Sequence, residues 1–146
     1  MKKLLLGIAA VCLAGFTFAQ DAPLWMRHSV ISPDGTTIAF TYKGDIYTVP
    51  VAGGRAMQIT TNPAYDTAPV WSPDSKRIAF ASDRMGSLDV YIVAKDGGEP
   101  RRLTTHSGSE TPLAFTDAGH VLFSAGIMPS AEAVVFPSNG QFNQVY

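Results

Sequence analysis

Apolar and polar residues alternate in short segments along most of this chain, and turn-forming residues separate the segments. Residues 77–82 show the pattern: Ile78 and Phe80 fall on one side of an extended chain, because successive side chains of a strand point to opposite faces. The chain is rich in Gly, Pro, Thr, Val and Phe and has few helix-favouring segments. The pattern therefore predicts an all-β protein of short antiparallel strands.

The alternating pattern itself repeats about every forty residues. The first copy contains Ser32-Pro33-Asp34-Gly35, Ile38-Ala39-Phe40, Asp45-Ile46-Tyr47, Gly53-Gly54 and Ile59-Thr60-Thr61. The second contains Ser72-Pro73-Asp74, Ile78-Ala79-Phe80, Asp89-Val90-Tyr91, Gly97-Gly98 and Leu103-Thr104-Thr105. The offset grows from 40 residues (38 to 78) to 44 (45 to 89), since the second copy has an insertion at 85–88. Repeats of this length are typical of stacked supersecondary units.

A third, degenerate copy begins near residue 111. Phe115 takes the place of Trp71, Asp117 that of Asp74, and residues 121–123 that of 78–80. After a longer stretch from 124 to 142, residues 144–146 (Gln-Val-Tyr) match the third strand of the earlier copies. On this register the sequence ends inside a strand, so we expect the sequence to be a truncated part of a longer protein.

Each copy predicts four short strands. In the second copy these are 68–71, 77–82, 89–94 and 101–104, with tight turns at Ser72-Pro73-Asp74-Ser75 and Asp96-Gly97-Gly98. Four antiparallel strands every forty-odd residues describe a β-propeller blade. We expect an incomplete propeller over 21–146 with about two and a half blades: blade 1 at about 25–61, blade 2 at about 67–105 and a truncated blade 3 at about 111–146.

The N-terminus has the pattern of a secretory signal peptide. Lys2 and Lys3 precede an uncharged run from 4 to 19, which is shorter than a membrane-spanning helix needs. Thr17-Phe18-Ala19 places small residues where a signal peptidase reads. We expect residues 1–20 to be removed and the protein to be periplasmic or secreted; an uncleaved anchor and a lipid-modified Cys12 are the alternatives.

Charge and cysteine content narrow the function classes. Without Lys2 and Lys3, nine basic residues face twelve acidic ones, a net charge of about −3 with no basic stripe for nucleic acid. Beyond the signal no apolar stretch could span a membrane. Cys12 is the only cysteine, so the mature chain has no disulfide to stabilise it.

The sequence offers no catalytic, cofactor-binding or metal-binding residue, and we expect no cofactor. It lacks Gly-x-Ser-x-Gly, His-x-x-x-His and a cysteine pair. The Gly-Gly pairs recur in register, which marks them as turn residues. His28, His106 and His120 occupy unrelated repeat positions, so we interpret them as solvated or hydrogen-bonded histidines.

Residues that recur at one repeat position are interpreted first as structural. The recurring aspartates should cap their own turns. The Trp71 position should hold a wedge between blades, and the Tyr91 position a packing aromatic. Asp83-Arg84 is interpreted as an internal ion pair at a strand end, with a partner contact as the alternative. The recurring sets are Asp34, Asp74 and Asp117; Ile31, Trp71 and Phe115; and Tyr47, Tyr91 and Tyr146.

The repeat resembles the blade of TolB-type propellers. The residues that carry the resemblance are Trp71-Ser72-Pro73-Asp74, Ile78-Ala79-Phe80-Ala81-Ser82-Asp83-Arg84, Asp89-Val90-Tyr91, Gly97-Gly98 and Leu103-Thr104. The first copy departs from it at Tyr42-Lys43-Gly44, where Ser82-Asp83-Arg84 stands in the second. The resemblance is strong over 29–105 and weak over 112–146. Several exported families share this blade, so it specifies the fold better than the function.

The run from Pro23 to Gly35 resembles the start of exported tricorn-like serine peptidases. That resemblance implies a propeller that filters or guides peptides toward a catalytic serine domain far downstream. The implied partners are peptides or unfolded segments and the C-terminal domains of the same chain, with homo-oligomers possible. A TolB-like, non-enzymatic binding propeller and the propeller of a prolyl-oligopeptidase-like hydrolase are the alternatives.

Overall fold

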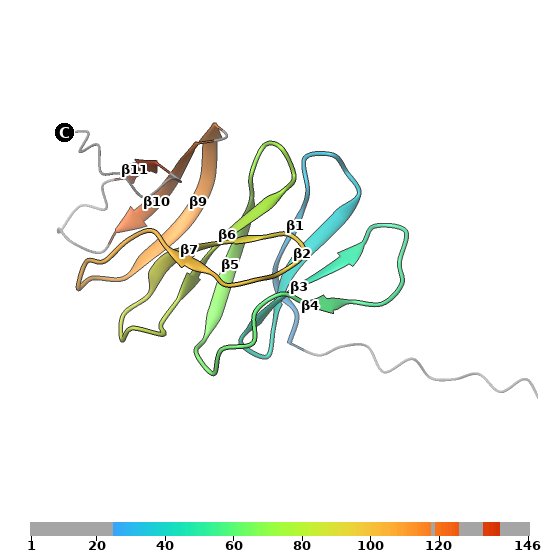
Figure 1. The fold of residues 1–146 in the computed structure, drawn as a ribbon, viewed down its shortest axis with the longest axis horizontal. Helices are drawn as coiled ribbons and strands as arrows, with labels where there is room; N and C mark the ends of the chain where they lie inside the picture. Colours follow the sequence, from blue (N-terminus) through green and yellow to red (C-terminus); the bar gives the residue numbers. More distant parts are fainter. Residues whose placement is uncertain (1–24, 118, 126–132, 138–146) are drawn as a thin grey trace, which may run out of the picture.

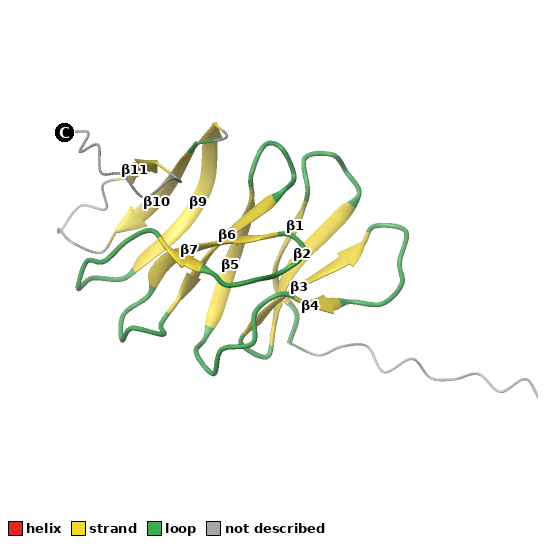
Figure 2. Cartoon of the chain, viewed as in Figure 1, coloured by secondary structure: helices red, strands yellow, loops and turns green. Residues whose placement is uncertain are grey.

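The computed structural model describes residues 25–117, 119–125 and 133–137. The expected signal peptide, residues 1–20, and the segment 138–146 lie outside these ranges. The described chain forms strands joined by loops and turns, with no helix (Figure 2). It therefore contains no helix that is long and apolar enough for a membrane crossing. The all-β prediction is confirmed.

The strands form three separate antiparallel sheets, which follow one another in chain order (Figure 1). The first contains β1 (Arg27–Ile31), β2 (Thr37–Tyr42), β3 (Asp45–Pro50) and β4 (Met57–Gln58). The second contains β5 (Asp66–Trp71), β6 (Arg77–Ser82), β7 (Asp89–Ala94) and β8 (Arg101–Arg102). The third contains β9 (Glu110–Asp117), β10 (His120–Ala125) and β11 (Ala133–Pro137). The first strands β1, β5 and β9 lie beside one another, which is how blades follow around a propeller axis.

The prediction for the third strand of the third blade is wrong. Sequence register placed it at 144–146, but β11, at Ala133–Pro137, pairs with β10 from Ser124↔Ala133 to His120↔Pro137. Residues 133–137 read Ala-Val-Val-Phe-Pro, and β-branched and aromatic residues favour an extended chain. They lie closer to β10 along the chain than the Tyr146 segment does. Residues 144–146 resemble the Asp-Val-Tyr strand of the earlier copies, but a nearer β-favouring segment forms the third strand.

The Ser-Pro-Asp turns are closed by their own side chains. The Gly35 N–H donates to the Ser32 carbonyl at 2.8 Å, and the Ser32 hydroxyl donates to the Asp34 carboxylate at 2.5 Å. Asp34 also accepts the Thr36 N–H at 3.0 Å. These hydrogen bonds, that from the Ser32 hydroxyl most of all, lower the pKa of Asp34 to about 2.

The other two recurring aspartates have the same role. The Asp74 carboxylate accepts the Ser72 hydroxyl at 2.6 Å and the Lys76 N–H at 3.1 Å. In the third blade, Asp117 accepts the Gly119 N–H at 2.6 Å. The interpretation of these aspartates as turn caps is confirmed.

The hydrophobic core lies between blades. Blade 1 contributes Ala39, Ile46 and Ile59 to the first cluster, and blade 2 contributes Trp71, Ile78, Phe80, Tyr91 and Val93. The second cluster joins Ala79, Val90, Ile92 and Leu103 of blade 2 to Val121, Phe123 and Ala125 of blade 3. Alternation along each strand thus gives a blade two apolar faces, one for each neighbour.

Trp71 is the wedge at the first blade junction. Its side chain is buried, and its indole Nε1–H donates to the Val30 carbonyl at 3.1 Å. Phe115 is partly buried against the second cluster. Ile31, at the same repeat position in blade 1, is 57% exposed, because no described residue packs over that face of the blade. The prediction of a core wedge is confirmed for Trp71. For Ile31 it stays a prediction, since the described residues include no blade before blade 1.

We predict that Trp71→Ala lowers the free energy of unfolding by about 3–5 kcal/mol, because it removes a large side chain from the blade junction. Trp71→Phe keeps most of the volume but leaves the Val30 carbonyl without its donor, so we expect a loss of about 1–3 kcal/mol. Hydrogen exchange of β1, β5 and β6 amides in the full-length protein measures both losses locally.

Trp25→Phe is the matched control, because the Trp25 side chain is 69% exposed. It should change the stability by no more than about 0.5 kcal/mol. Equal hydrogen-exchange protection of these amides in the Trp71→Ala and Trp25→Phe variants would show that Trp71 does not join the two blades.

Candidate functional site

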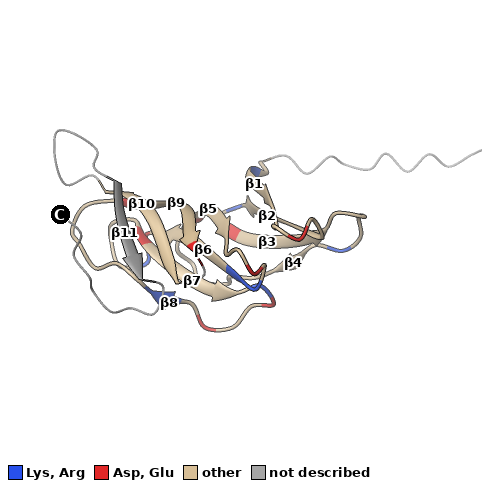
Figure 3. Cartoon of the chain, turned by 90° about the horizontal axis from the view of Figure 1, so that it is seen from above, with Lys and Arg blue, Asp and Glu red and all other residues tan. Residues whose placement is uncertain are grey.

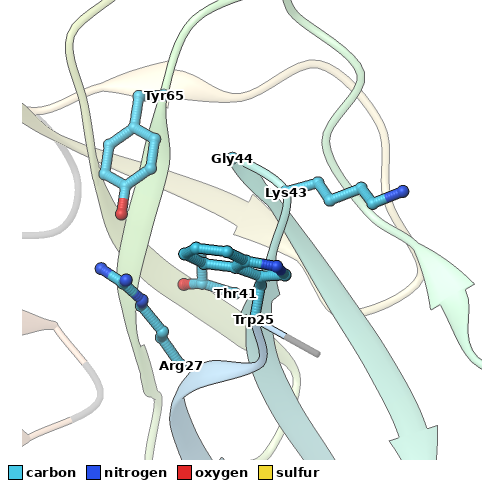
Figure 4. Close-up of a pocket in the computed structure, with 6 residues that line it drawn as sticks. All are labelled: Trp25, Arg27, Thr41, Lys43, Gly44 and Tyr65. Atoms are coloured by element: carbon cyan, nitrogen blue, oxygen red, sulfur yellow. The ribbon is translucent and has the colours of Figure 1, made fainter. Parts of the chain in front are cut away.

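A cavity of about 440 Å³ lies between blades 1 and 2, at the end away from the Ser-Pro-Asp turns (Figure 4). It is lined by Trp25, Arg27, Thr41, Lys43, Gly44 and Tyr65. These residues come from the start of β1, the end of β2 and the link into β5. The cavity therefore depends on the contact between the two blades.

The cavity lies where the first blade departs from the repeat. In blade 2, the Arg84 guanidinium lies 4.4 Å from the centre of the Tyr91 ring and pairs with Asp66 at 3.1 Å. Blade 1 has no arginine here. The Tyr42 ring instead meets the Tyr47 ring edge-on, with 5.8 Å between the ring centres. The substitution leaves the short Lys43-Gly44 turn at the wall of the cavity.

Backbone geometry holds the wall formed by Gly44 and Tyr65. Gly44 has φ 91°, a conformation that favours glycine, and its carbonyl accepts the Asp66 N–H at 2.7 Å. A Cβ added at Gly44 would lie 3.5 Å from the Tyr65 ring. Asp83 accepts the Tyr65 N–H at 2.7 Å and so fixes the start of β5. The position of Tyr65 is therefore set by residues of both blades.

Three polar groups face the inside of this cavity. The Arg27 guanidinium, the Tyr65 hydroxyl and the Thr41 hydroxyl point toward the same space, while the Lys43 ammonium points away from it (Figure 4). Thr41 is 2% exposed, and its Oγ1 has no hydrogen-bonding partner among the described residues. The Arg27 guanidinium lies 5.8 Å from the centre of the Trp25 ring. The cavity thus combines hydrogen-bond donors with exposed aromatic surface.

Buried acidic residues lie at the second blade junction. Asp89 is fully buried and pairs with Arg102 at 2.7 Å. Glu110 is 1% exposed and accepts the Thr104 hydroxyl at 3.1 Å, while Thr104 itself accepts the Val90 N–H at 2.9 Å. Burial raises the pKa of Glu110, and the negative charge of Asp89 raises it further. These contacts connect the end of one blade to the start of the next.

The predicted pairing of Asp83 with Arg84 is not the one that forms. Arg84 pairs with the buried carboxylate of Asp66, and Asp83 accepts the backbone N–H of Tyr65. The two residues lie in the turn after β6, and their side chains reach different partners. Both contacts are internal to this chain, as expected.

The three histidines have internal hydrogen-bonding partners. The Nδ1 atom of His28 lies 3.0 Å from the Thr67 hydroxyl, and that of His120 lies 2.8 Å from the Asp117 carboxylate. His106 Nδ1 accepts the Gly108 N–H at 3.0 Å. The interpretation as hydrogen-bonded histidines is confirmed. Within the described ranges, no three His, Cys, Asp or Glu side chains are close enough together to hold a metal ion.

The recurring tyrosines pack as predicted where the structure describes them. Tyr47 stacks on Phe40 and Tyr91 on Phe80, with 5.8 and 5.9 Å between ring centres. Tyr146 lies outside the described residues. Figure 3 shows basic and acidic residues interspersed along the described chain. Sequence reasoning did not single out Trp25, Arg27 or Tyr65; the departure at Tyr42-Lys43-Gly44 was the one signal that pointed to this cavity.

We predict that the stability of the Glu110→Gln variant, relative to that of the wild type, increases as pH rises. A Glu with a raised pKa in the folded state stabilises the fold below its unfolded pKa of about 4.5, and this contribution is lost as pH rises through the folded pKa. Glutamine does not titrate. Unfolding midpoints of the two full-length proteins at about pH 4 and about pH 6.5 test this. An equal difference at both pH values would contradict the raised pKa.

Comparison with known proteins identifies the fold and the family. The sequence profile described as "Tricorn protease N-terminal beta propeller domain" matches residues 23–138. Tricorn protease homolog 1 of Streptomyces coelicolor is 35% identical over 102 residues, which cover 69% of this chain and 9% of that protein. The uncharacterized peptidase YuxL of Bacillus subtilis is 30% identical over 129 residues, covering 87% of this chain and 20% of that protein.

A solved structure shows the same fold. The structure of a putative TolB from Agrobacterium tumefaciens superposes with a TM-score of 0.71 at 27% identity, covering 80% of this chain and 44% of that one. The present chain spans about one tenth of the length of Tricorn protease homolog 1 and one fifth of the length of YuxL. Its sheets, its repeat and the profile match lead to the same conclusion. The chain belongs to the family of tricorn protease N-terminal β-propeller domains.

Proposed function

We propose that this propeller segment belongs to an exported serine peptidase of tricorn type and guides peptides toward a catalytic domain elsewhere in the protein. The profile match over residues 23–138 is the observation that carries the proposal. The similarity to Tricorn protease homolog 1 supports it. The peptidase chemistry would come from residues outside this sequence, since the polar residues described here close turns and pair within a blade.

A propeller is suited to this role by its shape. Its blades stand around an axis, and the first strands β1, β5 and β9 run side by side. An extended peptide that approaches along the axis would meet the ends of these strands. The cavity of Figure 4 lies at one such end, where β1 begins and the chain enters β5. The proposed role therefore needs no reacting group within the propeller.

Export is part of the proposal. Lys2, Lys3 and the apolar run from 4 to 19 support a signal peptide over residues 1–20 and hence a periplasmic or secreted protein. Sequencing the N-terminus of the protein isolated from its cells would test this directly.

Two other functions have specific support. The superposition on the putative TolB favours a non-enzymatic propeller that binds partners in the cell envelope. The similarity to peptidase YuxL over 129 residues favours a prolyl-oligopeptidase-like hydrolase. In the second case a nucleophilic serine in Gly-x-Ser-x-Gly would follow the propeller.

We predict that the native protein is several-fold larger than 15.6 kDa and reacts with a fluorophosphonate that labels activated serines. An antibody against residues 25–117 would detect and isolate it from a periplasmic extract. Gel mobility gives the size, and mass spectrometry of the labelled peptide gives the nucleophile.

The outcomes separate the three functions. A large protein labelled at a serine outside Gly-x-Ser-x-Gly supports the tricorn type. A labelled Gly-x-Ser-x-Gly would replace it with the prolyl-oligopeptidase-like hydrolase. A protein that ends after its propeller and takes no label would leave the binding propeller as the function.

A further inference from the structure

We propose that the cavity between blades 1 and 2 binds an acidic side chain of an extended peptide together with an apolar neighbour of that side chain. The carboxylate would meet the Arg27 guanidinium and the hydroxyls of Thr41 and Tyr65, while the apolar neighbour lies against Trp25. This inference rests on the proposed function only in taking a peptide as the ligand.

The charge of the cavity favours an anion. Arg27 and Lys43 are the charged residues among its described lining, which includes no carboxylate. Among the described residues, no Asp or Glu forms an ion pair with Arg27, and its guanidinium lies over the Trp25 ring. A planar guanidinium with several N–H donors matches the geometry of a carboxylate. Within the described chain, the Arg27 guanidinium thus has no counter-charge, and a ligand carboxylate would supply one.

The Thr41 hydroxyl provides independent support for a ligand at this position. A buried hydroxyl without a partner lowers stability, and most such groups in folded proteins are hydrogen-bonded. Thr41 is 2% exposed, its Oγ1 has no partner in the described chain, and it faces the cavity (Figure 4). A ligand carboxylate there would accept this hydroxyl and that of Tyr65. The binding site is thus partly formed before the ligand arrives.

The aromatic walls account for the apolar part of the ligand. The Trp25 side chain is 69% exposed and that of Tyr65 is 42% exposed, although both residue types gain by burial. Both line the same cavity. An apolar or aromatic residue next to the acidic one would cover these rings. Side chains of successive residues in an extended peptide point in different directions, so the two groups can reach different walls.

Repeat geometry does not require this cavity. At the equivalent positions of the second junction, Thr67 replaces Arg27, Ala81 replaces Thr41 and Asp83 replaces Lys43. The Thr41 hydroxyl has no equivalent there, a carboxylate stands in place of Lys43, and the arginine of that junction, Arg84, already pairs with Asp66. A feature needed for blade stacking would recur at both junctions. A cavity that occurs at one junction and departs from the repeat is better explained by ligand binding than by blade stacking.

The test uses the full-length protein, with its nucleophile blocked by fluorophosphonate, and calorimetric titration with capped peptides. The peptides are acetyl-Gly-Gly-Glu-Phe-Gly-Gly-amide and the same peptide with Gln in place of Glu. We expect the Glu peptide to bind about threefold to tenfold more tightly, with the preference weakened by added salt.

Three variants identify the groups that give the preference. Arg27→Gln should remove the preference for Glu over Gln, because it deletes the facing cation. Thr41→Val keeps the shape of the side chain and should weaken binding of the Glu peptide severalfold. Lys76→Gln is the matched control, since Lys76 is an exposed cation at the opposite end of blade 2, and it should leave the preference unchanged. Unfolding midpoints of each variant confirm that the fold is intact.

Several results would overturn the inference. Equal affinity for the two peptides would exclude recognition of the acidic side chain, and a preference that survives Arg27→Gln would exclude this cavity. Tight binding of a Gln peptide that carries a free C-terminal carboxylate would assign the site to chain ends instead. If the protein has a labelled nucleophile but binds the Glu and Gln peptides equally, only this inference is refuted. If it prefers the Glu peptide but takes no label, only the peptidase function is refuted.

Discussion

The face-to-face packing of neighbouring blades is the constraint on which the rest of this structure depends. Each blade is a thin sheet of short strands with apolar residues on both faces, so no core forms inside it. Burying a large apolar side chain contributes about 1.5–3 kcal/mol, and here that gain comes from the adjacent blade. Trp71 shows this directly, because its indole packs on blade 1 and donates to the Val30 carbonyl.

Polar contacts then fix how the blades meet. Asp34 and Asp74 close the turns at one end of the strands. At the other end Arg84 pairs with Asp66 within blade 2, and Thr104 of blade 2 donates to Glu110 of blade 3. A fully buried carboxylate such as Asp66 requires a charged partner, so Arg84 helps to determine where the strand β5 begins. The cavity near Arg27 exists because blade 1 lacks this arginine.

Much of the fold could be predicted because the same strand and turn pattern occurs in two copies of the repeat. The strand at 77–82 and the Ser72-Pro73-Asp74 turn follow from alternation and turn chemistry, both of which are local. The third strand at Ala133–Pro137 was missed, since a degenerate copy offers no second example for its register. The partner of Arg84 and the cavity residues depend on contacts between blades, and one sequence does not show which distant side chains meet.

The dependence of each blade on a neighbour is tested most directly by sedimentation of residues 21–146 alone over a range of concentrations. Ile31 and Phe40 line an apolar hollow of about 580 Å³ on the outer face of blade 1, where no described residue takes the place of a preceding blade. Exposed apolar surfaces of this kind promote association. We predict oligomers or poor solubility. A monodisperse monomer with a cooperative thermal transition would contradict the claim that blade stability comes from the adjacent blade.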